Sequence, residues 1–283
     1  MPVLLPAAER LAQRAARERL LGGMPTLDLR LHHGLVLGGV LLSYALWAQA
    51  QGNGDQESVW GAVLKWTPFL LEGFGFNILI SFMAMALGTA TGAVLGIWQI
   101  SSLSPVRASA WLTTQFFRNA PWLVLLFFCM FLLPFQFEAL GFRIPFPDWL
   151  KATVGLALPV MANVSEIVRG AILSIPSGQW ESAESLAFNR RQTLWMIILP
   201  QCVKRMLPPW MNLYAILTMA TVLASIVGVE EVMTLTGQAL SSEGGRTDLL
   251  VPFYSMILLW FFLYCYPIAR FTLYLERRFA VKH

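Results

Sequence analysis

The sequence predicts an all-α, polytopic helical membrane protein with six transmembrane helices, on the strength of three observations. First, 57% of the 283 residues are hydrophobic and 13% are charged, with a mean hydropathy of +0.60, whereas about a quarter of the residues in soluble domains are charged. Second, Lys, Arg, Asp and Glu are absent from residues 31–54, 73–106, 119–137, 206–229 and 249–269. Third, these stretches match the roughly 20 residues with which a helix crosses a bilayer, not the alternating segments of about 10 residues in a barrel.

The expected elements follow from these stretches. A short amphipathic helix over residues 7–20 precedes the first span. A further apolar stretch, 152–165, is shorter and ends next to Glu166 and Arg169, so it predicts a span whose last turns are charged. The six spans are expected at 33–50, 75–100, 109–133, 150–172, 206–228 and 250–271.

The distribution of basic residues predicts the orientation of the spans. Most Lys and Arg residues fall in connections on one side, whereas the other side holds Lys65, Arg143 and Arg246. Under the positive-inside rule both termini are therefore cytoplasmic. Because topology explains the net charge of +4, no nucleic-acid partner is expected. Cys129, Cys202 and Cys265 lie in separate segments without metal-ligand spacing, so no metal site is expected either.

Small residues recur at every fourth position of the second span, at Ala84, Gly88, Gly92 and Gly96. They line one helical face and allow another helix to approach closely. We expect a packing ridge within the chain, with a seam between subunits as the alternative.

The connection between the fourth and fifth spans, 174–207, is the most informative part of the chain. Pro176 and Gly178 interrupt the exit from the fourth span, and Asn189 falls in a turn. Pro200 is expected to end a second short helix. This pattern predicts a helix, a turn and a second helix on the cytoplasmic face, which suits the docking of a soluble partner or an interfacial position.

Several motifs in this order resemble the permeases of binding-protein-dependent ABC importers, and most of all the branch that carries polar amino acids. Residues 178–183 (GQWESA) through 197–201 (IILPQ) resemble the EAA loop. Residues 117–124 (FRNAPWLV), 166–170 (EIVRG) and 223–230 (LASIVGVE) resemble three further segments. The resemblance covers about 73–279.

The resemblance implies a domain organisation and a fold. Spans two to six form a five-helix type I importer core over 73–272, with the EAA coupling loop at 174–207. Residues 1–32 form a cytoplasmic amphipathic segment, and 33–72 an additional first transmembrane helix with an extracytoplasmic loop. Residues 273–283 form a cytoplasmic tail.

The chain departs from the family pattern at three places. Ser182 replaces the alanine at the second position of the EAA triplet. Ala187 replaces the usual loop glycine and lacks its freedom at positive φ, so the turn is expected to shift toward Asn189. Residues 219–222 (MATV) replace a polar cluster, which puts substrate contacts there in doubt.

The resemblance also implies the partners and the location. They are a second permease subunit (a paralogue or a second copy), a cytoplasmic ATPase dimer, an extracytoplasmic amino-acid-binding protein and membrane lipid. The protein would be a multi-pass component of a bacterial inner membrane. The chain has no Gly-x-x-x-x-Gly-Lys-Ser/Thr phosphate loop. No cofactor is therefore expected in this chain, and the partner ATPase would bind ATP and Mg.

Two sets of functional residues are predicted. Glu181 leads the coupling set, because a carboxylate on the docking helix can pair with an ATPase surface; helix stabilisation is the alternative. The full coupling set is Gly178, Glu181, Ser182, Ala183, Ala187, Arg190 and Leu199. Intramembrane polar groups usually face a cavity or partner, and the expected substrate pathway comprises Asn163, Glu166, Arg118, Asn119 and Thr221; Asn212 also stands out. Glu166 and Arg169, three residues apart, are expected to pair.

Two functions from other classes remain as alternatives. A membrane-embedded enzyme would need a nucleophile or metal constellation, but His32, His33 and His283 lie far from Ser165 in sequence and no Gly-x-Ser-x-Gly elbow is present. A stand-alone secondary transporter would favour internal repeats, and none is evident. The sequence therefore favours a transporter subunit that is not itself an enzyme.

Overall fold

The structure, a computed structural model, describes residues 34, 36, 38–40, 43–44, 47, 58–139 and 142–279, and of 137–144 it gives no side chains. The chain divides into two units, Met1–Val40 and Leu41–His283. The described residues of the first unit are helical. The segment 1–32 and most of the expected first span lie outside the described residues, so the following account concerns the second unit.

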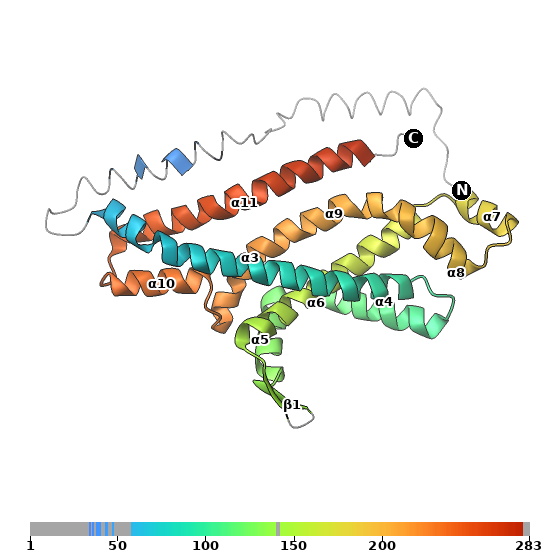
Figure 1. The fold of residues 1–283 in the computed structure, drawn as a ribbon, viewed down its shortest axis with the longest axis horizontal. Helices are drawn as coiled ribbons and strands as arrows, with labels where there is room; N and C mark the ends of the chain where they lie inside the picture. The colour runs from blue at the N-terminus through green and yellow to red at the C-terminus, as the bar shows by residue number, and fades with distance from the viewer. Residues whose placement is uncertain are drawn as a thin grey trace, which may run out of the picture. The chain divides into compact units, whose positions relative to one another are not determined.

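Apolar helices build the second unit, and the all-α class is confirmed (Figure 1). Four described helices are long and apolar enough to cross a membrane, and a bent pair makes up to five. The long helices are α3 (Val59–Trp98), the pair α4 (Ser104–Asn119) and α5 (Trp122–Leu132), α6 (Asp148–Leu173), α9 (Leu199–Ala220) and α11 (Leu250–Phe279). The shorter ones are α7 (Ser177–Ser185), α8 (Arg190–Gln192), the π-helix η1 (Thr193–Ile198), α10 (Val232–Ser242) and two 3₁₀ helices, η2 (Thr221–Val227) and η3 (Thr247–Leu249).

Helices α3 and α6 form a close interface along the predicted ridge of small residues. A Cβ atom on Gly88 would lie 2.5 Å from Val160, and one on Gly92 would lie 2.5 Å from the carbonyl oxygen of Met161. Glycine is therefore required where the two backbones approach. The ridge packs within the chain, as expected.

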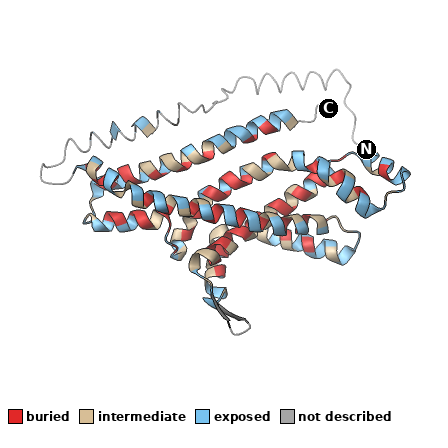
Figure 2. Cartoon of the chain, in the orientation of Figure 1, coloured by how far each residue is buried: buried red, intermediate tan, exposed pale blue. Residues whose placement is uncertain are grey.

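Buried and exposed residues alternate along α3 (Figure 2), and exposed apolar residues such as Phe82 and Trp98 suit a lipid or subunit environment.

The third span is broken, and the prediction of one helix over 109–133 is wrong. Helices α4 and α5 meet at an angle of 106°, and Figure 1 shows α4 beside α3 with α5 turning away. Ala120 and Pro121 join the two helices in extended conformation. Proline disfavours the helical conformation of the residue before it and has no N–H to donate, so the helix ends there.

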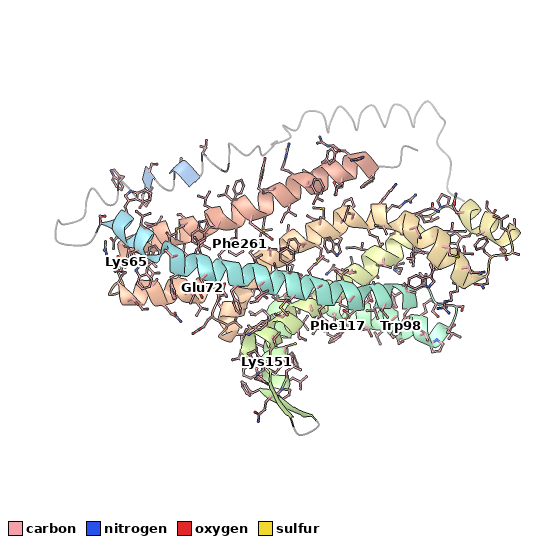
Figure 3. The ribbon with its side chains drawn as sticks, viewed as in Figure 1. Lys65, Glu72, Trp98, Phe117, Lys151 and Phe261 are labelled. Carbon is pink, nitrogen blue, oxygen red and sulfur yellow. The ribbon has the colours of Figure 1, made fainter. Side chains whose placement is uncertain are left out.

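A small β-hairpin between α5 and α6 was not predicted. Strands β1 (Gln136–Ala139) and β2 (Phe142–Pro145) pair antiparallel, with Gln136 opposite Pro145. The fully buried Lys151 lies where α6 begins (Figure 3). Its Nζ is 3.2 Å from Asp148 Oδ1 and 3.3 Å from the ring centroid of Phe135. An ion pair and a cation–π contact thus hold this lysine at the base of the hairpin.

Two expected domain boundaries fall inside helices and need correction. Residues 59–72, expected as part of a loop, form the first turns of α3, which begins where the Ser58 side chain accepts a hydrogen bond from Gly61 N at 3.1 Å. Lys65 ties these turns to the end of α10 through Glu243 Oε1 at 2.8 Å. Residues 273–279 belong to α11 and not to a separate tail.

A buried polar network joins α3 to the connection between the fifth and sixth spans. Glu231 is fully buried at the start of α10 and accepts backbone hydrogen bonds from Met233 and Thr234 at 2.9 and 3.1 Å. Asn77 Nδ2 donates to Glu231 Oε2 at 2.8 Å and to Thr221 Oγ1 at 3.0 Å. Burial raises the pKa of the Glu231 carboxyl above its ordinary value of 4.5, although these hydrogen bonds oppose the rise.

This shift predicts a pH-dependent contribution to stability. Above pH 4.5 and up to the raised pKa, the folded state holds a proton that the unfolded state has lost, so the free energy of unfolding falls as pH rises. Glu231→Gln keeps the side-chain size and removes this titration. As the pH rises from 4.5 through the raised pKa, we expect the thermal midpoint in detergent to fall more steeply for wild type than for the variant. Equal slopes would contradict the assignment.

Candidate functional site

Helix α7 projects its polar face outward from the connection between α6 and α9. It begins after Pro176, and Gly178, Glu181 and Ser182 are exposed. Ala183 is 1% exposed and is the one buried residue of α7, and this helix packs on η1. Figure 1 shows α7 and α8 together near the end of α6. The Glu181 carboxylate lies in the second turn, where its interaction with the helix dipole is weak.

The turn after α7 occurs at Ala187, and the expected shift toward Asn189 is wrong. Ala187 has φ 60°, in the left-handed region, and the amide of Phe188 donates to the Ala183 carbonyl at 3.1 Å. This hydrogen bond closes a Schellman-type end to the helix. Asn189 instead starts α8, in a capping box in which it and Gln192 exchange hydrogen bonds of 2.9 Å.

Restoring glycine at this turn is expected to stabilise the protein. The left-handed conformation costs a non-glycine residue about 1–2 kcal/mol, and glycine has its own entropic cost, so Ala187→Gly should gain about 0.5–1 kcal/mol. Thermal unfolding in detergent would show a raised midpoint. Ala187→Val, which places a β-branched residue at positive φ, should lower it. A lowered midpoint for Ala187→Gly would contradict the strain at this turn.

The second helix of the connection continues directly into the fifth span, so Pro200 does not end it. Residues 193–198 form a π-helix, and the amide of Leu199 donates to Leu194 O, five residues back. Proline has no N–H to donate, and in a regular α-helix its ring would clash with the carbonyl four residues before it. The wider turn of the π-helix relieves this clash and so tolerates Pro200. Leu199 is half-buried against the core. The expected loop 174–207 therefore includes the first turns of α9.

A polar cavity of about 530 Å³ lies between α4, α6 and α9. Its polar lining residues are Arg118, Asn163, Glu166, Ser174, Arg205 and Asn212. Arg169 Nη2 is 2.7 Å from Glu166 Oε2, which confirms the predicted pair, and Arg118 Nη1 is 3.9 Å from the same oxygen. The Glu166 side chain is 15% exposed. A carboxylate held between two guanidinium groups therefore borders the cavity.

The amide and arginine groups around this carboxylate have defined partners. Asn163 Nδ2 donates to Pro159 O at 2.8 Å within α6, which leaves the carbonyl of its side chain as a possible ligand acceptor. Arg205 Nη1 donates to both the backbone oxygen and the hydroxyl of Ser174 at 2.7 Å. Arg205 and Asn212 are seven residues apart on α9, a spacing that places them on one helical face.

A second polar cluster lies behind Glu166. Gln99, at the end of α3, donates to Thr114 Oγ1 at 3.1 Å and to Ser165 Oγ at 2.8 Å, and all three side chains are buried. These hydrogen bonds join α3, α4 and α6. This cluster was not predicted, because polar residues on three different helices give no local signal in the sequence.

Two of the predicted pathway residues do not line the cavity. Asn119 is exposed and donates to Gln115 O at 2.7 Å within its own helix. Thr221 is fully buried in the network of Asn77 and Glu231. Arg190, which is predicted to contact a partner, is exposed and donates to Ile100 O at 2.9 Å, at the turn between α3 and α4.

An apolar helical unit with a polar cavity between its spans, and with an exposed helix in one connection, defines a subunit of a membrane transporter. Residues 88–281 match the family described as "Binding-protein-dependent transport system inner membrane component". The chain belongs to this family. It is therefore a multi-pass inner-membrane permease subunit of an ABC transporter and not an enzyme, and the ATPase is a separate subunit.

Individual relatives agree with this family. The probable amino-acid ABC transporter permease protein YckA of Bacillus subtilis is 35% identical over 75% of this chain and 90% of its own length. The glutamine transport system permease protein GlnP of Escherichia coli is 32% identical over 66% and 83%. The E. coli inner membrane amino-acid ABC transporter permease protein YhdY is 28% identical over 88% and 71%.

Solved structures show the same fold. A crystal structure of an amino acid ABC transporter with histidines superposes with a TM-score of 0.65 at 23% identity, covering 76% of this chain and 96% of the other. An inward-facing structure of the MetNI methionine ABC transporter has a TM-score of 0.53 at 16% identity, with coverages of 73% and 94%.

Proposed function

We propose that this permease carries an amino acid across the membrane through the cavity that contains Glu166. The observation that carries the proposal is the Glu166 carboxylate held between Arg118 and Arg169 at the edge of a polar cavity. A zwitterionic amino acid needs an acceptor for its ammonium group and a cation for its carboxylate. Glu166 supplies the first, and Arg118 the second, with the amides of Asn163 and Asn212 nearby.

The amino-acid substrate is supported by the names of the relatives. YckA is named as a probable amino-acid permease and GlnP as a glutamine permease. Asn119 and Thr221, which do not line the cavity, would act only by supporting its walls. The complete transporter would contain a second copy or a paralogue of this chain, an ATPase dimer that binds ATP and Mg, and an extracytoplasmic amino-acid-binding protein. Both termini would be cytoplasmic.

The coupling element of this proposal is α7 with η1. Glu181 would pair with a basic or amide group of the ATPase, because its carboxylate is exposed and no described residue forms an ion pair with it. The other coupling residues would shape the element. Ala183 anchors it, Ala187 turns the chain, and Leu199 joins it to the span.

The N-terminal helix over 33–50 would be an addition to the five-span core. The match with YhdY covers 88% of this chain and so extends beyond that core.

Co-purification tests the coupling role. The tagged protein would be isolated from its native host in mild detergent, and mass spectrometry would identify the subunits that accompany it. Glu181→Ala is expected to lower the recovery of the ATPase about tenfold, as for the loss of a central charged contact. Glu184→Ala is the matched control, because it removes another exposed carboxylate of the same helix.

Transport assays test the substrate. The purified complex in vesicles is expected to take up radiolabelled glutamine or arginine only with ATP and the binding protein. If wild type were isolated without an ATPase, the importer proposal would fail. If the ATPase were present but no amino acid were taken up, only the substrate would need revision.

A further inference from the structure

A second cavity, of about 550 Å³, lies beside the coupling element and is bordered by three guanidinium groups. Arg107 comes from α4, Arg169 from α6 and Arg190 from α8. None of the residues that line it is acidic. Arg169 is paired with Glu166, but Arg107 and Arg190 have no role in the proposed substrate pathway, and the inference drawn from these two does not depend on that pathway.

Two of these arginines are held by neighbouring backbone carbonyls rather than by acids. Arg190 Nη2 donates to Ile100 O at 2.9 Å, and Arg107 Nη1 donates to Ser101 O at 3.1 Å. Within the part of the chain that the structure describes, no carboxylate forms an ion pair with Arg107 or Arg190. Each guanidinium has five N–H donors. Most of their donors therefore remain available to an anion in the cavity.

A buried hydrogen-bond acceptor, the side-chain carbonyl of Gln99, adds a second requirement for a ligand of this cavity. Gln99 lines the cavity and is 5% exposed. Its Nε2 is used by Thr114 and Ser165, but its Oε1 has no hydrogen-bond partner among the described residues. A buried carbonyl oxygen without a donor costs about 1–3 kcal/mol. A ligand that carries hydroxyl donors as well as negative charge would satisfy both groups once the Gln99 amide, whose Oε1 is buried, turns toward the cavity.

The remaining walls are apolar, which favours one source of such a ligand. Ile172, Leu173 and Trp180 line the cavity, and Leu173, at the end of the α6 span, is 64% exposed. Basic pockets beside membrane-spanning helices on the cytoplasmic side bind the headgroups of anionic lipids. The glycerol headgroup of phosphatidylglycerol has both a phosphate and hydroxyl donors.

We propose that this cavity binds a hydroxyl-bearing phosphate group, supplied by an anionic phospholipid of the phosphatidylglycerol type. Arg107 and Arg190 bind the phosphate, and Gln99 Oε1 accepts a hydrogen bond from a headgroup hydroxyl. The site joins α8, which lies between α7 and η1 in the chain, to the turn between α3 and α4. Free hydrogen phosphate offers the same chemistry without the acyl chains, and the experiment separates the two sources.

Native mass spectrometry of the full-length protein, purified with the subunits that accompany it and then delipidated, provides the test. The sample is titrated with phosphatidylglycerol or with phosphatidylcholine of the same acyl chains, with and without inorganic phosphate. The double variant Arg107→Gln/Arg190→Gln should weaken the retention of phosphatidylglycerol about 25-fold, since each of the two basic groups near a membrane surface contributes about fivefold. Arg191→Gln is the matched control, because it removes an adjacent exposed charge that does not line the cavity.

Loss of phosphatidylglycerol in the double variant but not in Arg191→Gln, with little displacement by inorganic phosphate, supports the lipid site. Displacement of phosphatidylglycerol by inorganic phosphate in wild type alone supports the phosphate site but assigns it to the free ion. Equal retention by wild type and the double variant, or equal loss in Arg191→Gln, overturns the proposal. If the double variant does not elute as a monodisperse species, the single Arg107→Gln and Arg190→Gln variants are compared by the same criteria.

Discussion

Replacing Gly92 with leucine is expected to prevent α3 from packing against α6. A Cβ atom at this position would already lie 2.5 Å from the carbonyl oxygen of Met161 and 2.8 Å from Val164, and backbone atoms cannot move aside as a flexible side chain can. We expect a loss of at least about 3 kcal/mol, the upper end of the range for overpacked cores. Thermal unfolding and size-exclusion chromatography in detergent would measure it.

The matched control is Gly75→Leu, on the same helix. No atom lies within 4 Å of a Cβ atom added there, and the residue is exposed. Leucine is also a better helix former than glycine. Stability should therefore remain unchanged or rise slightly. If both variants unfolded at the wild-type temperature, the contact between α3 and α6 would not depend on the small residues.

Replacing Glu166 with glutamine is expected to lower amino-acid uptake about tenfold or more, because truncating one partner of a charged, partly desolvated contact typically costs that much. The variant removes the negative charge that Arg118 and Arg169 share. It also leaves Arg118, which lines the cavity, and Arg169 without a counter-charge. The glutamine side chain still offers an acceptor to Arg169, so the fold should persist. ATP-dependent uptake in vesicles, measured beside thermal stability, separates the two effects.

Glu184→Gln is the control for this second prediction. It removes an exposed carboxylate on α7 that lies outside the cavity, and it should transport as wild type does. Wild-type uptake by Glu166→Gln with an intact fold would remove Glu166 from the substrate pathway. The docking of the ATPase through α7 would be unaffected by that result.

Local signals in the sequence predicted most of the fold. The runs without charge gave the spans, and the spacing of Gly88, Gly92 and Gly96 gave the interface of α3 with α6, because helical periodicity determines which residues share a face. Pro121 carried a signal for the break in the third span, but the apolar residues around it concealed that signal. The hairpin after α5 had no strong pattern, because the alternation of its few residues is too short to recognise.

The errors at the coupling element have a common physical origin. The conformational penalty at Ala187 and the missing donor of Pro200 each cost only a few kcal/mol. The cap of α7, the capping box of Asn189 and the packing of Ala183 offset such costs. Sequence rules that treat one residue at a time do not include this compensation.

The candidate site was predictable only in part for a different reason. Glu166 and Arg169 pair within one helix, so their spacing was sufficient. The approach of Arg118 and Asn212 depends on how separate helices are rotated, which the sequence does not specify. Thr221 begins the 3₁₀ helix η2 and faces Asn77 of α3, which donates a hydrogen bond to its hydroxyl, rather than the cavity. A 3₁₀ helix has three residues per turn, so the side chains that follow face other directions.

The continuity of the helical path from α8 to η2 has a mechanical consequence. Residues Arg190–Val227 form one helical piece of 38 residues, which is about 57 Å long at 1.5 Å per residue. Helix α7 packs on η1 at one end of this piece, and near the other end Thr221 accepts a hydrogen bond from Asn77. Pro208 and Pro209, near its middle, lack two backbone N–H donors, and proline is a common cause of bending in helices. If α7 is the docking helix, as proposed above, a force applied to it would pass by packing to η1 and from there along the covalent backbone to the Asn77 network.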